Sequence, residues 1–70
     1  MEGTIEKILD ELTVTVKYSE KGKNISNIMR IENTEKINIK IGYRVQFNIH
    51  NKDAYRRIIC RVVDERRYEK

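Results

Sequence analysis

Apolar and polar residues alternate with a period of two along much of the chain. The clearest stretch is residues 43–50, YRVQFNIH, where Val45, Phe47 and Ile49 are apolar and the residues between them are polar. Residues 12–18, LTVTVKY, alternate in the same way. A period of two is typical of a β-strand with one face in a core and the other in water. The pattern therefore predicts a strand in both places.

Three further runs complete the predicted set of strands: residues 3–9, GTIEKIL; residues 25–31, ISNIMRI; and residues 55–63. The apolar residues of 25–31 fall out of step, which predicts a β-bulge or a strand that ends in a helical turn. Residues 5–12 also carry apolar residues at helical spacing. That segment is short and β-branched residues follow it, so we favour a strand there.

The fold class follows from the number and spacing of these strands. Five short strands separated by turns are typical of a small barrel, whose closure removes exposed sheet edges. An OB-fold-type barrel and an SH3-like barrel both fit a chain of 70 residues. The longest gap, residues 32–38, lies between the third and fourth strands, where the OB-fold has its crossover connection. We therefore predict an all-β, five-stranded OB-fold-type barrel over residues 1–63 and a charged tail over residues 64–70.

The parity of each strand predicts which side chains form the core. Tyr18 has the parity of the apolar residues before it and is assigned with them. The other predicted core residues are Ile5, Val14, Val16, Val45, Phe47, Ile49, Ile58, Cys60 and Val62.

Composition limits the classes to which the protein can belong. A single cysteine excludes an intrachain disulfide, and no stretch is apolar enough to cross a bilayer. The first ten residues, MEGTIEKILD, enter a strand pattern at once, so we expect no signal peptide. We expect a soluble, cytoplasmic protein whose oligomeric state the sequence leaves open.

Charge is distributed unevenly along the chain. The net charge is +4, but residues 1–35 carry five basic and seven acidic residues, or −2, and residues 36–70 carry ten and four, or +6. A basic half indicates a surface that can meet phosphate.

Three segments resemble two families of small OB-fold proteins, the cold-shock proteins and the smallest bacterial translation initiation factor. EGTIEKIL resembles their opening strand, INIKIGYRVQFNI resembles the segment through their fourth strand, and RRIICRVV resembles the last strand of the initiation factor. The resemblance implies an OB barrel and RNA as a ligand.

The sequence departs from the cold-shock pattern where those proteins stack bases. Residues 12–18 and 25–31 hold one aromatic, Tyr18, and its parity assigns it to the core. The stacking platform of cold-shock proteins is therefore missing from these strands, and the expected contribution of about 1–3 kcal/mol per stacked base is missing with it. The resemblance implies that the initiation factor binds RNA more through basic side chains than through stacking. On that count the chain resembles the initiation factor more than it resembles the cold-shock proteins.

No catalytic or metal-binding constellation can be assembled from the sequence. His50 is the single histidine and is expected in water, and Cys60 is expected to be a buried, inert thiol. The paired acids Asp10-Glu11 and Asp64-Glu65 fall at a turn and in the tail, where carboxylates are usually solvated. We expect a protein that is not an enzyme and needs no cofactor or metal.

The remaining candidate site is a polar, basic face on the outer side of the strands. Arginine suits phosphate, and amides and hydroxyls suit phosphate or sugar. We therefore predict a nucleic-acid-binding face that contacts RNA, or another single-stranded nucleic acid, through the basic residues Lys17, Lys40, Arg44, Arg56, Arg57, Arg61, Arg66 and Arg67.

Two alternatives stay open. One is a protein-interaction module, or a small subunit that docks on a larger complex, with Tyr43 and Tyr55 as exposed anchors. The other is a structural domain with a partner that the sequence does not identify. The salt dependence of binding would separate both from the nucleic-acid hypothesis.

Overall fold

The computed structural model describes residues 1–32 and 39–64. This part of the chain forms five β-strands and no helix, and so contains no helix that could span a membrane. The strands are β1 (Glu2–Asp10), β2 (Thr13–Glu20), β3 (Lys23–Ile31), β4 (Arg44–Lys52) and β5 (Ile58–Asp64). Of the predicted tail, residues 64–70, Asp64 is the last residue of β5, and residues 65–70, which include Arg66 and Arg67, lie outside the described residues.

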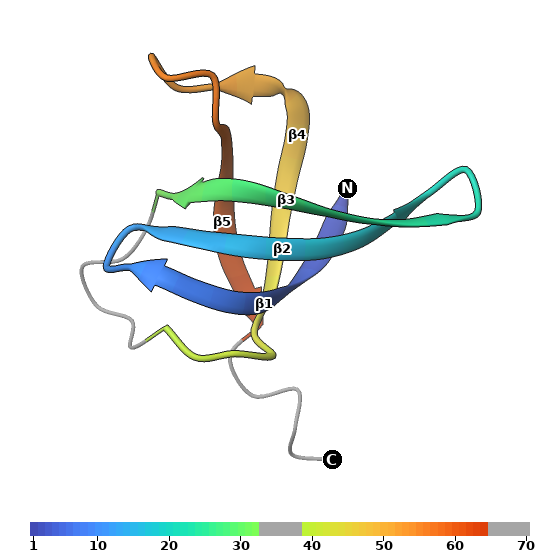
Figure 1. The fold of residues 1–70 in the computed structure, drawn as a ribbon, viewed down its shortest axis with the longest axis horizontal. Coiled ribbons are helices and arrows are strands. Elements are labelled where there is room, and N and C mark those ends of the chain that lie inside the picture. The colour runs from blue at the N-terminus through green and yellow to red at the C-terminus, as the bar shows by residue number, and fades with distance from the viewer. Residues whose placement is uncertain (33–38, 65–70) are drawn as a thin grey trace.

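The five strands close into a barrel in the order β1-β2-β3-β5-β4, and β4 pairs again with β1. All neighbouring pairs are antiparallel except β3 and β5, which are parallel. This is the order of an OB-fold-type barrel, and the predicted fold class is confirmed. Figure 1 shows β1, β2 and β3 crossing in front of β4 and β5 at a large angle, as in orthogonally packed sheets.

Two hairpins extend beyond the barrel in Figure 1. The β2–β3 hairpin turns through Lys21 and Gly22, whose φ angles of 51° and 79° are both positive. Two such residues form the tight turn that matches the twist of paired strands. The β4–β5 hairpin projects at the opposite end of these two strands from residues 39–43, and its loop carries several of the predicted site residues.

The core is formed by the inward faces of all five strands. Eight of the nine predicted core residues are buried; Ile49 is half-buried and packs against the core. Tyr18 is buried as predicted, and its ring meets Phe47 edge-on with centroids 4.8 Å apart. The buried hydrophobic residues that the core prediction did not include are Met29, Ile31 and Tyr43.

The irregularities of the barrel are not where the sequence pattern put them. β3 pairs with β2 residue for residue from Lys23 to Arg30, so the bulge or helical turn predicted there was wrong. Ile28 points outward and is 49% exposed, whereas Met29 and Ile31 point inward. The exposed isoleucine, and not a bulge, put the apolar pattern out of step.

Register shifts occur on β1 and β4 instead. β1 shifts twice against β2, and β4 shifts twice against β5, between Arg44 and Val45 and between Phe47 and Lys52. In that last interval β4 runs through four residues while β5 runs through one, Ile59. The extra length turns Ile49 partly away from the core, which is why its burial is incomplete.

Candidate nucleic-acid interface

Two predicted cations from distant parts of the chain flank the same residue of β1. Lys17 on β2 and Arg44 on β4 are both register partners of Thr4. Both side chains are exposed and line one shallow hollow, together with Glu2. Strand pairing has therefore gathered the two cations on one outer side of the barrel.

Arg44 already has an acidic partner in this hollow. Its guanidinium pairs with Glu2, and both side chains are 46% exposed. The hydrogen bond from Arg44, a second one from Gln46 and the charge of Arg44 hold the pKa of Glu2 below its ordinary value. Exposed ion pairs are weak, so a phosphate could share or displace Glu2 at little cost.

Arg61 extends the same outer surface on to β5. It pairs in register with Gln46 of β4, which pairs in turn with Glu2 of β1. Arg61 is exposed and makes no ion pair within residues 1–32 and 39–64. A polar hollow beside it is lined in part by Gln46, Asn48 and Asn51. Lys17, Arg44 and Arg61 thus lie on β2, β4 and β5 along one outer side of the barrel, and we call these three residues the basic row. The hollows beside them also contain two acids, Glu2 and Glu32.

Arg57 does not belong to this row. It precedes β5, and its side chain is 34% exposed. Its Nε donates to Asp53 Oδ2 at 3.2 Å, and its Nη1 lies 3.5 Å from Thr13 Oγ1 on β2. The expectation that Arg57 stands in water on the face of a strand was wrong. Its side chain connects the β4–β5 loop to the barrel.

Asp53 organises that loop. One carboxylate oxygen accepts the backbone N–H of Tyr55 at 2.9 Å and that of Arg57 at 2.8 Å. These backbone hydrogen bonds, that of Arg57 foremost, and the Arg57 guanidinium hold the pKa of Asp53 below its ordinary value. The Asp53 side chain is only 4% exposed, so the loop is built around a carboxylate that its own backbone satisfies.

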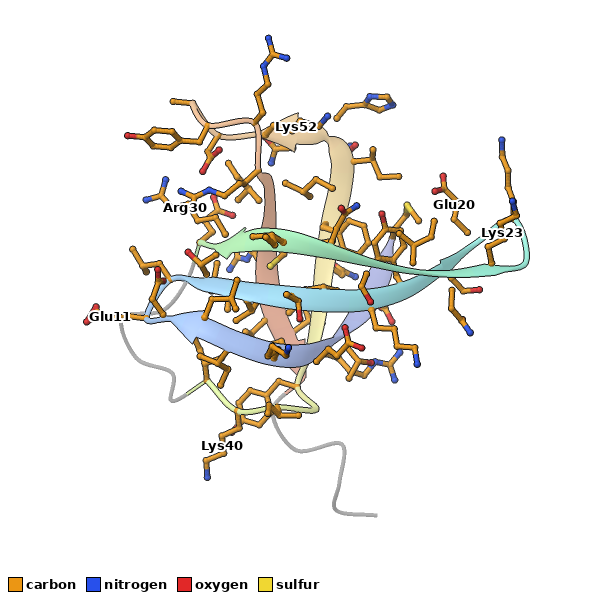
Figure 2. All side chains as sticks on the ribbon, in the orientation of Figure 1. Glu11, Glu20, Lys23, Arg30, Lys40 and Lys52 are labelled. Carbon is orange, nitrogen blue, oxygen red and sulfur yellow. The ribbon has the colours of Figure 1, made fainter. Side chains whose placement is uncertain are left out.

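Arg56 and Lys40, two further predicted site residues, lie in different parts of the structure. Arg56 is exposed in the β4–β5 loop with φ 66°. Lys40 is exposed before β4, and Figure 2 shows it at the opposite end of the molecule from Lys52. Arg66 and Arg67 lie outside the described residues.

Two cations near the β4–β5 loop were not among the predicted site residues. Lys52 pairs in register with Ile58 and Arg30 with Ile59, so the two residues flank the start of β5 from β4 and β3. Figure 2 shows both at this end of the hairpin. Arg30 was missed because the parallel pairing of β3 with β5 cannot be derived from spacing along the chain.

The two tyrosines predicted to be exposed anchors differ in their exposure. Tyr55 is 78% exposed, but Tyr43 is 8% exposed and belongs to the core, so its predicted exposure was wrong. Tyr43 has the inward parity of Val45 and Phe47, and its carbonyl accepts the backbone N–H of Ile5 at 2.9 Å. An anchor pair made of both tyrosines is therefore excluded.

The reactive residue types are isolated from one another. Cys60 is 1% exposed, and burial, with a smaller effect of the Glu32 charge, raises its pKa to about 12. His50 is exposed, and its backbone N–H donates to Asn48 Oδ1 at 2.9 Å. Within residues 1–32 and 39–64 no three His, Cys, Asp or Glu side chains are grouped as metal ligands would be.

Comparison of the chain with protein-family models, with curated proteins and with solved structures found no match.

Proposed function

We propose that this chain is a non-catalytic nucleic-acid-binding domain that holds the backbone of RNA, or of another single-stranded nucleic acid, against the outer side of its β4–β5 hairpin. The charge of that hairpin carries the proposal. Residues 44–64 include five basic residues and two acids, Asp53 and Asp64, so the hairpin alone has a net charge of +3. Asp53 is engaged by Arg57, which leaves the exposed cations of the hairpin available to phosphate.

The chemistry of the basic row suits a sugar–phosphate chain. Arg44 and Arg61 offer planar guanidinium groups, and Gln46 and Asn48 beside them can donate to phosphate oxygens or accept from sugar hydroxyls. The resemblance of three segments to the initiation factor and the cold-shock proteins supports RNA as the ligand. The OB-type barrel is compatible with that resemblance.

The proposed contacts differ from the predicted set in one respect. Lys17, Arg44 and Arg61 are the central phosphate contacts, and Lys40, Arg56, Arg66 and Arg67 are rim contacts. Arg57 acts chiefly as a support of the loop, because Asp53 and Thr13 hold its guanidinium.

The test is the salt dependence of binding, measured by fluorescence anisotropy with a labelled oligouridylate of about 12 nucleotides. If about four phosphates are contacted on a single strand, log K should fall against log salt with a slope near −3 over about 50–200 mM salt. Arg44→Gln with Arg61→Gln removes two of these contacts and should reduce the slope by about 1.4. Extrapolated from 1 M salt, that change corresponds to a loss of affinity of about 25-fold at about 0.1 M.

A control with the same loss of charge is available on the other hairpin. Lys21 and Lys23 lie in and beside the β2–β3 turn, and Figure 2 shows Lys23 at the tip, away from β4 and β5. Lys21→Asn with Lys23→Gln should change affinity much less than the arginine pair. Equal losses in the two double variants would mean that net charge, and not the β4–β5 hairpin, governs binding. Absent or salt-independent binding would contradict the proposal and favour a protein-interaction module.

A further inference from the structure

Tyr55 is the most exposed of the large hydrophobic side chains in the described part of the chain, at 78%. A single exposed aromatic residue needs no special explanation. Tyr55 differs from an ordinary surface residue because the loop that presents it is closely tied together. The exposed ring bears on which form of nucleic acid the domain binds, an inference that rests on the proposed function.

Five hydrogen bonds close the loop around Tyr55. Asp53 Oδ1 accepts the N–H groups of Tyr55 and Arg57, and the Asp53 carbonyl accepts the N–H of Arg56 at 2.9 Å. The Asp53 N–H donates to the Arg57 carbonyl at 2.9 Å, and Arg57 Nε donates to Asp53 Oδ2. The backbone on both sides of Tyr55 is therefore fixed relative to Asp53.

The ring of Tyr55 is supported from one side. The Arg57 guanidinium carbon lies 5.2 Å from the ring centroid, within the range of a cation–π contact. The same guanidinium is held by Asp53 and lies beside Thr13, so the support connects the ring to β2. Because the residue is 78% exposed, the ring keeps a large surface open to a ligand.

Further exposed cations lie on the chain segments next to the loop. Arg56 is adjacent in the chain, and Lys52 and Arg30 flank the start of β5. All three are exposed. An aromatic surface set among exposed cations is the combination by which proteins bind single strands: the ring stacks on a base and the cations meet the flanking phosphates.

We propose that Tyr55 is a stacking platform for one unpaired base, and that the ligand of this domain is therefore single-stranded or has a base out of its helix. A base inside a duplex is covered by its neighbours and cannot offer a face to the ring. The phosphates on either side of the stacked base meet Arg56, Lys52 and Arg30. The platform lies on the β4–β5 loop and not on β2 and β3, whose one aromatic residue, Tyr18, is buried in the core.

The test compares Tyr55→Ala and Tyr55→Phe with the unmodified chain by anisotropy. The probes are the labelled oligouridylate and a labelled RNA duplex of similar length. A stacked base corresponds to a loss of about 5- to 160-fold for Tyr55→Ala on the single strand. Tyr55→Phe keeps the ring and should bind the oligouridylate about as well as the unmodified chain. The salt slope should be unchanged in both variants, because no phosphate contact is removed.

The duplex separates stacking from a general loss of binding. Tyr55→Ala should leave the affinity for the duplex unchanged. Equal affinity of Tyr55→Ala and the unmodified chain for the oligouridylate would overturn the stacking inference while leaving the proposed function in place. An equal loss on both probes, or a changed salt slope, would also overturn it. No binding of either probe by the unmodified chain would overturn the proposed function and this inference together.

Discussion

Gly3 is the position at which the barrel should be most sensitive to one added methyl group. It is buried on β1, directly opposite Val45 of β4. A Cβ atom placed there would lie 2.5 Å from Val16 Cγ1 and 2.9 Å from the Lys17 carbonyl oxygen. Comfortable contacts between carbon atoms are about 3.5–4.0 Å, so β1 and β2 must separate to admit alanine.

The size of the effect follows from two opposing contributions. Where an alanine fits, replacing glycine stabilises a protein by about 0.4–1 kcal/mol, because the unfolded chain loses freedom. Overpacking a well-packed site costs about 1–3 kcal/mol. The Lys17 oxygen is backbone and cannot rotate away, so we expect the clash to exceed the gain and Gly3→Ala to destabilise by about 1–2 kcal/mol. For a domain of this size that is a fall in melting temperature of about 4–16 °C.

Thermal and urea unfolding followed by circular dichroism would measure the change. A double-mutant cycle with Val16→Ala tests the cause, because that substitution removes the Cγ1 atom that the new methyl group meets. The double variant should be more stable than the sum of the two single effects predicts. Stability equal to or above that of the unmodified chain in Gly3→Ala would refute the steric reasoning. Additivity within about 0.5 kcal/mol would show that Val16 is not the residue that must move.

Two further predictions concern ionisable groups. The folded-state pKa of Asp53 lies below its ordinary value of 3.8, so its stabilisation is fully present above that pH and is lost as the pH falls through the folded-state value. The acid branch of unfolding free energy against pH should therefore be flatter for Asp53→Asn than for the unmodified chain; identical branches would contradict this. Cys60, with a pKa raised to about 12, should react with iodoacetamide near neutral pH only as fast as the barrel opens. Rapid alkylation of the native protein, at the rate seen in urea, would show that the thiol is accessible.

The barrel could be predicted because its strongest strands keep one parity. In β4, and in β2 from Val14 onward, the apolar residues of the alternating pattern are the ones that face the core, and the assignments of Val16, Tyr18, Val45 and Phe47 are confirmed. Tyr43 has the inward parity of Val45 and could have been assigned to the core by the same rule.

β3 could not be read this way, because Ile28 and Met29 are adjacent and apolar and only one can face inward. The choice between them depends on which of them meets the barrel interior. β3 pairs with β5, whose residues lie 29 positions further along the chain, in the parallel registers Met29↔Ile58 and Ile31↔Cys60. No periodicity within residues 25–31 contains that information, and the slip was therefore assigned to a bulge.

The basic face was predictable as a charge but not as a site, because a count of arginines does not show which of them have partners. Arg57 and Arg61 are four residues apart and were predicted to act together. The structure holds Arg57 between Asp53 and Thr13, while Arg61 has no ionic partner among the described residues. The pattern Asp-x-Tyr-Arg-Arg at residues 53–57 contained the signal, since an aspartate commonly accepts the backbone N–H two residues ahead of it.

Because the arginines of the hairpin differ in their partners, they should differ in how readily they bind phosphate. The guanidinium of Arg61 has no ionic partner among the described residues, so it can meet an anion there without breaking an ion pair. Arg44 must share or release Glu2, which costs little because the pair is exposed. Arg57 would have to release Asp53, whose carboxylate would then remain almost completely buried without its charged partner. The contribution to phosphate binding should therefore decrease from Arg61 to Arg44 to Arg57, although the three residues carry the same charge. The loss of Arg57 should act instead through the loop and the ring of Tyr55, which it supports.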